Sequence, residues 1–118
     1  MGKVKRLFKM VNKAKEEKKR IKKRDKEWSI RVKNSFNNIC AFCDKDKYIQ
    51  AHHIIPREIK KFRYNHLNGI ALCPRHHKWG MESAHSNPLW FFMKLEKMYS
   101  LKLRILKLKY KNDKESNL

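Results

Sequence analysis

The chain has 118 residues, a mass of 14.4 kDa and a formal net charge of +20, from 31 Lys and Arg against 11 Asp and Glu. This length allows one small domain with basic extensions, and the charge favours a polyanionic partner: nucleic acid first, with a ribosomal or membrane-surface role behind it. The sequence shows neither an apolar run of the ~18–20 residues that cross a bilayer nor a secretory signal. Its three cysteines, two of them in a C-x2-C pair, predict thiolate ligands rather than disulfides, so a cytoplasmic location is expected.

Residues 1–27 form a basic N-terminal extension with 13 Lys/Arg against 4 Asp/Glu. Apolar residues at i, i+3, i+4 and i+7 from Val4 to Val11 predict one face of an amphipathic helix. The remainder is almost entirely polar, so the extension is either helical or disordered until it meets a polyanion. An arm that binds nucleic acid and a solvated charge run with no specific role are both open.

Residues 28–100 are predicted to form the folded domain. Apolar spacing from Trp28 predicts a helix that ends at Asn37-Asn38. A β-rich run over 48–55 stops at Pro56 and predicts a strand, and a second, short strand is predicted over 70–72.

Two further helices are predicted after the second strand. The first has Pro74 at its first position and ends at Gly80, and the second is capped by Asn87. Residues 101–118 form a basic C-terminal extension, in which the alternating pattern leaves helix and strand equally open.

Four candidate ligands have the spacing of a structural zinc site. Cys40 and Cys43 are three residues apart, Cys73 and His76 repeat that spacing, and 29 residues separate the two pairs. A Cys3His set is common for tetrahedral structural zinc, and in so small a domain the ion would supply folding free energy on the order of ~10 kcal/mol. His77 could take the place of His76.

More histidines are present than one tetrahedral ion can use. His52 and His53 are adjacent on the predicted strand, so their side chains are expected on opposite faces. One of them could bind a metal while the other approaches a substrate. The surplus predicts a second metal site with an open position.

Together these motifs resemble the HNH endonucleases, also called ββα-metal or His-Me finger nucleases. The resemblance covers roughly residues 28–80, and it rests on Cys40-x2-Cys43, the run 51–56 (AHHIIP), Asn68 five residues before Cys73, and Cys73-x2-His76-His77. Where the family usually has Asp-His this chain has His52-His53, and where it often has a fourth Cys this chain has His76. Both replacements keep a metal ligand, and they leave the preferred catalytic metal open.

The resemblance implies a role for each matching residue. His53 would be the general base that deprotonates the attacking water, and His52 and His77 would bind one catalytic divalent ion. Asn68 would hold the loop and orient His53 through its side-chain carbonyl, although in some relatives the equivalent Asn binds the metal. The implied products carry 5′-phosphate and 3′-hydroxyl ends.

Basic residues just after the predicted strand are candidates for contacts to the DNA backbone: Arg57, Lys60, Lys61 and Arg63. His66 is expected at the surface. His85 could contact metal or phosphate, and its role is left open. Trp79 and Trp90 are expected in the core rather than stacked on bases.

The expected fold class is therefore α+β: a small zinc-stabilised ββα-metal (HNH) domain with flanking basic helices. The predicted function is a metal-dependent endonuclease that nicks or cleaves DNA, which is expected to be double-stranded, as a monomer or homodimer and of phage or mobile-element (homing) type. The cofactors would be a structural Zn2+ and one catalytic Mg2+, Mn2+, Zn2+ or Ni2+. A non-catalytic zinc-stabilised DNA-binding module and a structural RNA or ribosomal protein are the alternatives.

Overall fold

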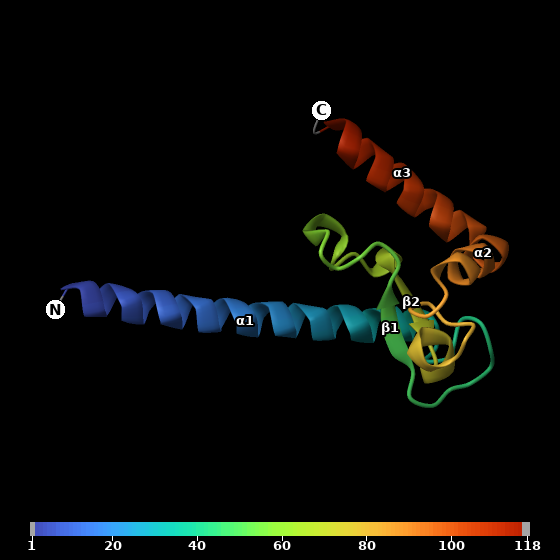
Figure 1. Cartoon of the computed structure of the whole chain (residues 1–118), viewed down its shortest axis with the longest axis horizontal. Coiled ribbons are helices and arrows are strands. Elements are labelled where there is room, and N and C mark those ends of the chain that lie inside the picture. Colours follow the sequence, from blue (N-terminus) through green and yellow to red (C-terminus); the bar gives the residue numbers. More distant parts are fainter. Residues whose placement is uncertain (1, 117–118) are drawn as a thin grey trace.

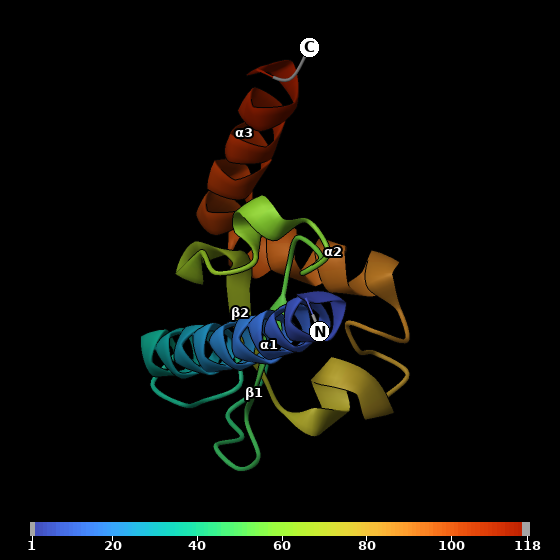
Figure 2. The ribbon, with the colours of Figure 1, turned by 90° about the vertical axis from the view of Figure 1, so that its left-hand side faces the viewer.

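A computed structural model of the chain describes residues 2–116, and its dominant feature is one long helix. Helix α1 (Gly2–Ser35) extends away from the other elements (Figure 1). With α1 included, the molecule measures 61 × 40 × 24 Å. Viewed nearly along α1, the other elements lie around the end of this helix (Figure 2). Only Trp28 and Val32 of α1 are buried, so the helix is anchored by its C-terminal part alone.

The anchored part of α1 packs on a two-stranded antiparallel sheet. Strand β1 (Gln50–His53) pairs with β2 (Gly69–Leu72), and His52 lies opposite Ile70 in the ladder. Every residue of β2 is buried. Helix α1 covers one face of the sheet, and the core residues of the loop after α1 and of the helix Pro88–Met98 cover the other.

Short turns and two helices complete the fold. Single 3-10 turns, η1 (Lys60–Phe62) and η2 (His66–Asn68), connect the strands, and one π-helical turn, η3 (Arg75–Trp79), follows β2. Helix α2 (Pro88–Met98) begins after Asn87, whose side chain caps the Trp90 amide, and α3 (Ser100–Ser116) follows at once. Phe91, Leu95 and Leu106 are the largest side chains that these two helices bury in the core.

The predicted α+β class and most predicted elements are confirmed. The N-terminal extension is helical and continues without a break into the Trp28 segment, and the undecided 101–110 segment is helical as part of α3. The extension's final residues, 117–118, lie outside the described part of the chain. The predicted strand over 48–55 is shorter in the structure, because only Gln50–His53 pairs with β2.

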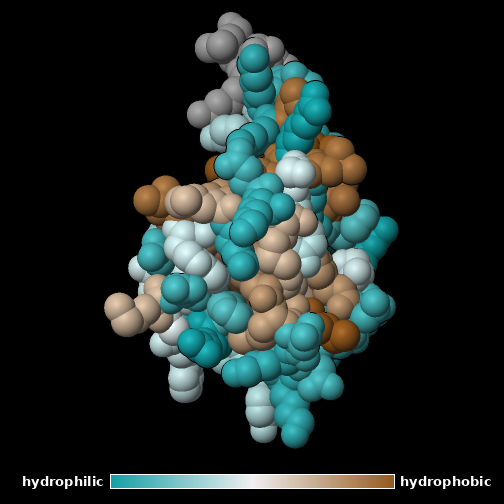
Figure 3. Space-filling model, turned by 90° about the vertical axis from the view of Figure 1, so that its right-hand side faces the viewer, coloured by the Kyte–Doolittle hydropathy of each residue, from teal (hydrophilic) through white to brown (hydrophobic). Residues whose placement is uncertain are grey.

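The expectation that Trp79 is a core residue was wrong: its side chain is 86% exposed. Trp90 is half-buried, and its ring lies parallel to that of His76 with the centroids 5.8 Å apart. Among residues 2–116, none of the helices is long and apolar enough to cross a membrane. The face on the right-hand side of Figure 1 mixes hydrophilic residues with apolar ones (Figure 3).

Candidate metal and catalytic centre

The four residues predicted to bind zinc lie together in the structure. The sulfurs of Cys43 and Cys73 are 3.8 Å apart, and the His76 Nδ1 atom lies 3.6 Å from the Cys40 sulfur and 3.3 Å from that of Cys73. In a tetrahedron with zinc–sulfur bonds of about 2.3 Å, two sulfurs are about 3.8 Å apart and sulfur and nitrogen about 3.5 Å apart. The observed separations therefore fit a tetrahedral Cys3His zinc site.

The electrostatics of this cluster also favour a bound cation. Burial and the neighbouring thiols raise the pKa of Cys43 to about 11, so this thiol keeps its proton at pH 7 on its own. A coordinated divalent cation offsets the repulsion between thiolates and deprotonates the thiols. The cluster thus suits a structural zinc, and the ion would join the loop after α1 to the start of η3.

A second group of possible metal ligands consists of three histidines. His52 comes from β1, His77 from η3 and His85 from the loop before α2, and one ring nitrogen of each lies within 4.8 Å of the others. The Nε2 atoms of His77 and His85 are 3.1 Å apart. Two imidazole nitrogens on one tetrahedral ion would be about 3.3 Å apart, so this separation also fits a shared metal.

The backbone brings His85 to this group. The His85 amide donates to the carbonyl of His77, and the Ala84 amide donates to that of His76, so the loop before α2 runs alongside η3. Sequence reasoning left the role of His85 open, because nothing in the spacing of residues 77 and 85 predicts this pairing. In the structure it is a third candidate ligand.

Hydrogen bonding and burial leave these imidazoles ready to bind a cation. The Nδ1 atom of His77 lies 2.5 Å from the side-chain oxygen of Gln50, so Nδ1 donates its proton and Nε2 keeps its lone pair. Burial, with the neighbouring histidines, lowers the pKa of His52 to about 3 and that of His77 to about 4. Both rings are therefore neutral at pH 7, the state that binds metals.

His53 leaves β1 on the opposite face, toward α1. Its ring stacks on the Trp28 indole with the centroids 3.7 Å apart and the planes 4° from parallel. Its Nε2 atom lies 3.0 Å from the carbonyl oxygen of Arg63, which can only accept, so Nε2 carries the proton. The nitrogen with an available lone pair is Nδ1, and burial lowers the pKa of the ring, which keeps it neutral.

Helix α1 fixes the two groups that contact the His53 ring, which are the Trp28 indole and the Arg63 carbonyl. Trp28 donates its indole N–H to the carbonyl of Asn65 at 2.9 Å. One turn earlier, Asp25 binds the Arg63 guanidinium through two hydrogen bonds of 2.9 and 2.7 Å. The Arg63 side chain is mostly buried, and its guanidinium is committed to Asp25 rather than free for a phosphate.

Asn68 is fully buried, and backbone groups use its whole amide. The side-chain oxygen accepts from the Ile55 amide at 2.6 Å, and the side-chain nitrogen donates to the carbonyls of Ile55 and Phe62. The Asn68 oxygen does not accept a hydrogen bond from His53 as expected: it accepts from the Ile55 amide, and His53 Nε2 donates to the Arg63 carbonyl. Asn68 holds the loop, and the acceptor for His53 is the Arg63 carbonyl.

His52, His53, His77 and His85 all line one cleft of about 490 Å³. Arg57, Lys78 and Glu58 line it as well, so the cleft presents two cations and one carboxylate beside the histidines. Lys60 and Lys61 are exposed on η1 and line a neighbouring basic cleft against α1, and Lys61 pairs with Asp113 of α3. The half-buried His66 belongs to neither histidine group.

Sequence reasoning missed three residues that contact the predicted site: Gln50, Asp25 and Trp28. Trp28 and Asp25 share one face of α1 at i and i+3, but that spacing alone does not reveal what the face covers. Gln50 directly precedes the run 51–56 on the same strand. It lies two residues before His52, so the two side chains are expected on the same face, and that spacing was the available signal.

Comparison with known proteins agrees with the sequence motifs. Residues 40–79 match the family model described as HNH endonuclease. No curated protein and no solved structure matches the chain. The matched segment contains both candidate metal groups except His85, and it excludes α1.

Proposed function

The chain carries an HNH endonuclease domain at residues 40–79, and from this premise we propose that the protein hydrolyses phosphodiester bonds of DNA with one catalytic divalent metal. The observation that supports the proposal is that the two adjacent histidines of β1 belong to two different sites. Three imidazoles meet on one face, and His53 stands on the other with Nε2 occupied and Nδ1 available. A protein that only binds nucleic acid needs neither arrangement.

In this proposal His52, His77 and His85 hold the catalytic ion. When bound, such an ion neutralises charge on the phosphate and on the leaving oxygen. Gln50 keeps the His77 ring in the tautomer that leaves Nε2 available. The Cys3His cluster is proposed as a separate structural zinc site, because Cys40 and Cys73 are buried and none of the three cysteines lines the histidine cleft.

His53 is the proposed general base. Its Nδ1 takes a proton from water as the water oxygen bonds to phosphorus, and the bond from phosphorus to the 3′ oxygen breaks. The Nε2–H group continues to donate to the Arg63 carbonyl, whose oxygen stabilises the positive charge that His53 gains. The products would be a 5′-phosphate and, after protonation of the leaving oxygen, a 3′-hydroxyl.

Trp28, Asp25 and the Arg63 backbone are proposed as positioning residues for His53. The indole holds the plane of the imidazole, and the ion pair between Asp25 and Arg63 fixes the strand segment that supplies the carbonyl. Helix α1 would then belong to the catalytic unit although the family match excludes it. The helix would also carry charge to the DNA, with 13 Lys/Arg in residues 1–27.

The basic groups along α1 and η1 are proposed to bind the DNA backbone without reading sequence. Arg57 lines the cleft of the catalytic histidines, and Lys60 and Lys61 line the cleft against α1. A monomer has one such cleft, so we expect single-strand nicks from a monomer and double-strand breaks from a homodimer or two successive nicks.

A plasmid assay tests the proposal. Purified protein is incubated with supercoiled plasmid and, in separate reactions, Mg2+, Mn2+, Zn2+ or Ni2+, beside His53→Ala and a His66→Ala control. We expect wild type and the control to nick and His53→Ala to lose nicking. An intact plasmid with every ion would refute the enzyme, and equal nicking by His53→Ala would refute the base.

A further inference from the structure

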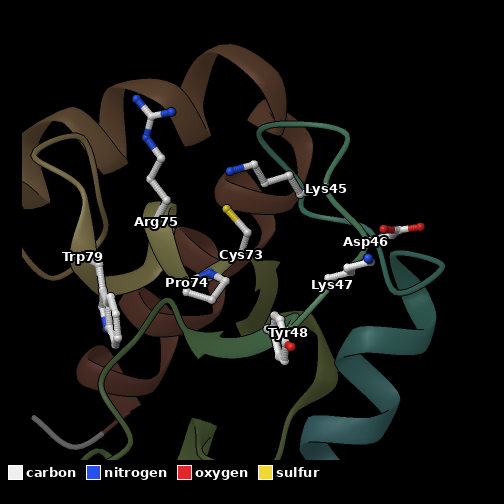
Figure 4. A pocket seen from close by; sticks show the side chains of 8 residues that line it. All are labelled: Lys45, Asp46, Lys47, Tyr48, Cys73, Pro74, Arg75 and Trp79. Carbon is white, nitrogen blue, oxygen red and sulfur yellow. The ribbon is translucent and has the colours of Figure 1, made fainter.

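Two aromatic side chains are exposed beside a cleft that contains none of the proposed catalytic histidines. Trp79 is 86% exposed and Tyr48 is 82% exposed, and both line a cleft of about 510 Å³. Figure 4 shows both side chains among those that line this cleft, with Pro74 between them in this view. Large aromatic rings gain most from burial, so two such rings left in water beside one cleft indicate a surface that a partner covers.

The backbone at Tyr48 is also unusual. Its φ is 57°, in the left-handed region that a bulky residue adopts only at a cost in free energy. The Tyr48 ring gains no compensating burial from this conformation, since it stays in solvent. Strained residues of this kind gather at ligand sites, where they hold a side chain in place for a partner.

The charges around the two rings define that partner. Lys45, Lys47 and Arg75 are all exposed and line the same cleft. Asp46 is the one acid among the lining residues, and its carboxylate points away from the rings (Figure 4). Aromatic faces among cations are the combination that binds a single nucleic-acid strand, with bases on the rings and phosphates on the cations.

The cleft also adjoins the proposed catalytic centre along the chain. Trp79 ends η3, the turn that carries His77, and the intervening Lys78 lines the histidine cleft. Tyr48 lies two residues before Gln50, the hydrogen-bond partner of His77. The cleft with the two rings and the histidine cleft therefore lie on different sides of η3, since residues two apart on a helical turn do not face the same way.

We propose that Tyr48 and Trp79 form a stacking site for unpaired bases of a nucleic-acid strand, with Lys45, Lys47 and Arg75 on its phosphates. This deepens the proposed function, on which it rests for the identity of the polymer as DNA. It adds one feature of the substrate: bases that are unpaired, or that become unpaired on binding, at this cleft. A fully paired duplex cannot offer its bases to these rings.

Tryptophan fluorescence tests this site directly, because Trp79 is exposed whereas Trp28 is buried and Trp90 half-buried. His53→Ala protein without added divalent ion is titrated with a DNA strand of about 16 nucleotides, at the upper end of single-strand site sizes. The same strand as a blunt duplex and as RNA are the other arms. The His53→Ala background prevents cleavage, so failure of the catalytic proposal does not affect the measurement.

We expect the DNA strand to quench the fluorescence, and Trp79→Phe to abolish most of that quenching. Trp79→Ala should weaken single-strand binding by about 5- to 100-fold. Leu89→Ala, which removes a 72% exposed apolar side chain on α2, should leave it unchanged. Lys47→Ala should lower the salt dependence of binding, and Trp79→Ala should not.

Equal quenching by the duplex, or single-strand binding that Trp79→Ala leaves intact, would overturn the stacking site. If RNA alone quenched, the stacking site would stand and the assignment of DNA as the polymer would fall. If no strand quenched while the plasmid was still nicked, the stacking site would fall and the proposed nuclease would stand.

Discussion

Adding one methyl group at Gly69 should separate α1 from the sheet. A Cβ atom built on Gly69 would lie 2.9 Å from Trp28 Cζ2 and 2.9 Å from Val32 Cγ1, and closer still to Val32 Cγ2. Carbon atoms in packed cores are about 3.5–4.0 Å apart, so all three contacts overlap. Gly69 has φ −141° and ψ 152°, which alanine adopts without strain, so the effect of Gly69→Ala is steric alone.

The magnitude follows from what can move. Val32 is fully buried and β-branched within a helix, so its side chain has little freedom to rotate away. Overpacking of this kind costs about 1–3 kcal/mol, and with a urea slope of ~1–3 kcal/mol/M the unfolding midpoint should fall by about 1 M. Since α1 must shift, Trp28 should also leave the His53 ring, and nicking by the folded protein should slow.

Urea unfolding followed by circular dichroism, and plasmid nicking well below the unfolding midpoint, check this prediction. Gly2→Ala is the matched control, because a Cβ there meets no atom within 4 Å. Adding Val32→Ala to Gly69→Ala should recover stability, so that the double variant is less destabilised than the sum of the single changes. Unchanged stability of Gly69→Ala, or strict additivity with Val32→Ala, would refute the packing argument.

Three further variants separate the roles proposed for the site. Asp25→Asn should slow nicking about 10-fold or more with little change in DNA affinity, because it releases the segment whose carbonyl holds His53. Glu96→Gln makes an equal charge change at an exposed position of α2 and should have no such effect. Equal nicking rates for the two variants would contradict the positioning role. His85→Ala should raise the divalent-ion concentration for half-maximal nicking at least ~10-fold while zinc content stays constant; an unchanged ion requirement would remove it from the ligands. Cys43→Ser should lose tightly bound zinc by metal analysis, and retention of zinc would argue against the structural site.

Cys40, Cys43, Cys73 and His76 lie together as predicted, as do His52 and His77, and part of that geometry is local. Cysteines at i and i+3 in a turn aim at one point wherever the turn lies, and adjacent residues on a strand must face opposite ways. His85 could not be found in this way, because a hydrogen-bonded pairing of two irregular segments brings it to His77. No residue pattern encodes such a pairing.

The remaining differences also have physical causes in tertiary structure. Strand β1 ends before Ile55, within the β-rich run 48–55, because both backbone groups of Ile55 form hydrogen bonds with the Asn68 side chain and not with a neighbouring strand. Trp79 is hydrophobic enough to predict burial, yet η3 ends at that residue and leaves it in solvent. In the 101–110 segment, helix was decided by Leu103 and Leu106, which reach the core at i and i+3.

The pair His76-His77 shows why a structural zinc would matter for catalysis as well as for stability. Turn η3 has five residues, too few for a helix to hold its shape through its own hydrogen bonds. His76 lies in the cysteine cluster and His77 in the histidine group, so an ion on the first would fix the backbone that aims the second. Loss of the structural ion would then misplace the His77 ring even where the core around Phe91 and Leu95 survives. On this argument, Cys43→Ser should lose nicking under conditions in which its helices are still folded.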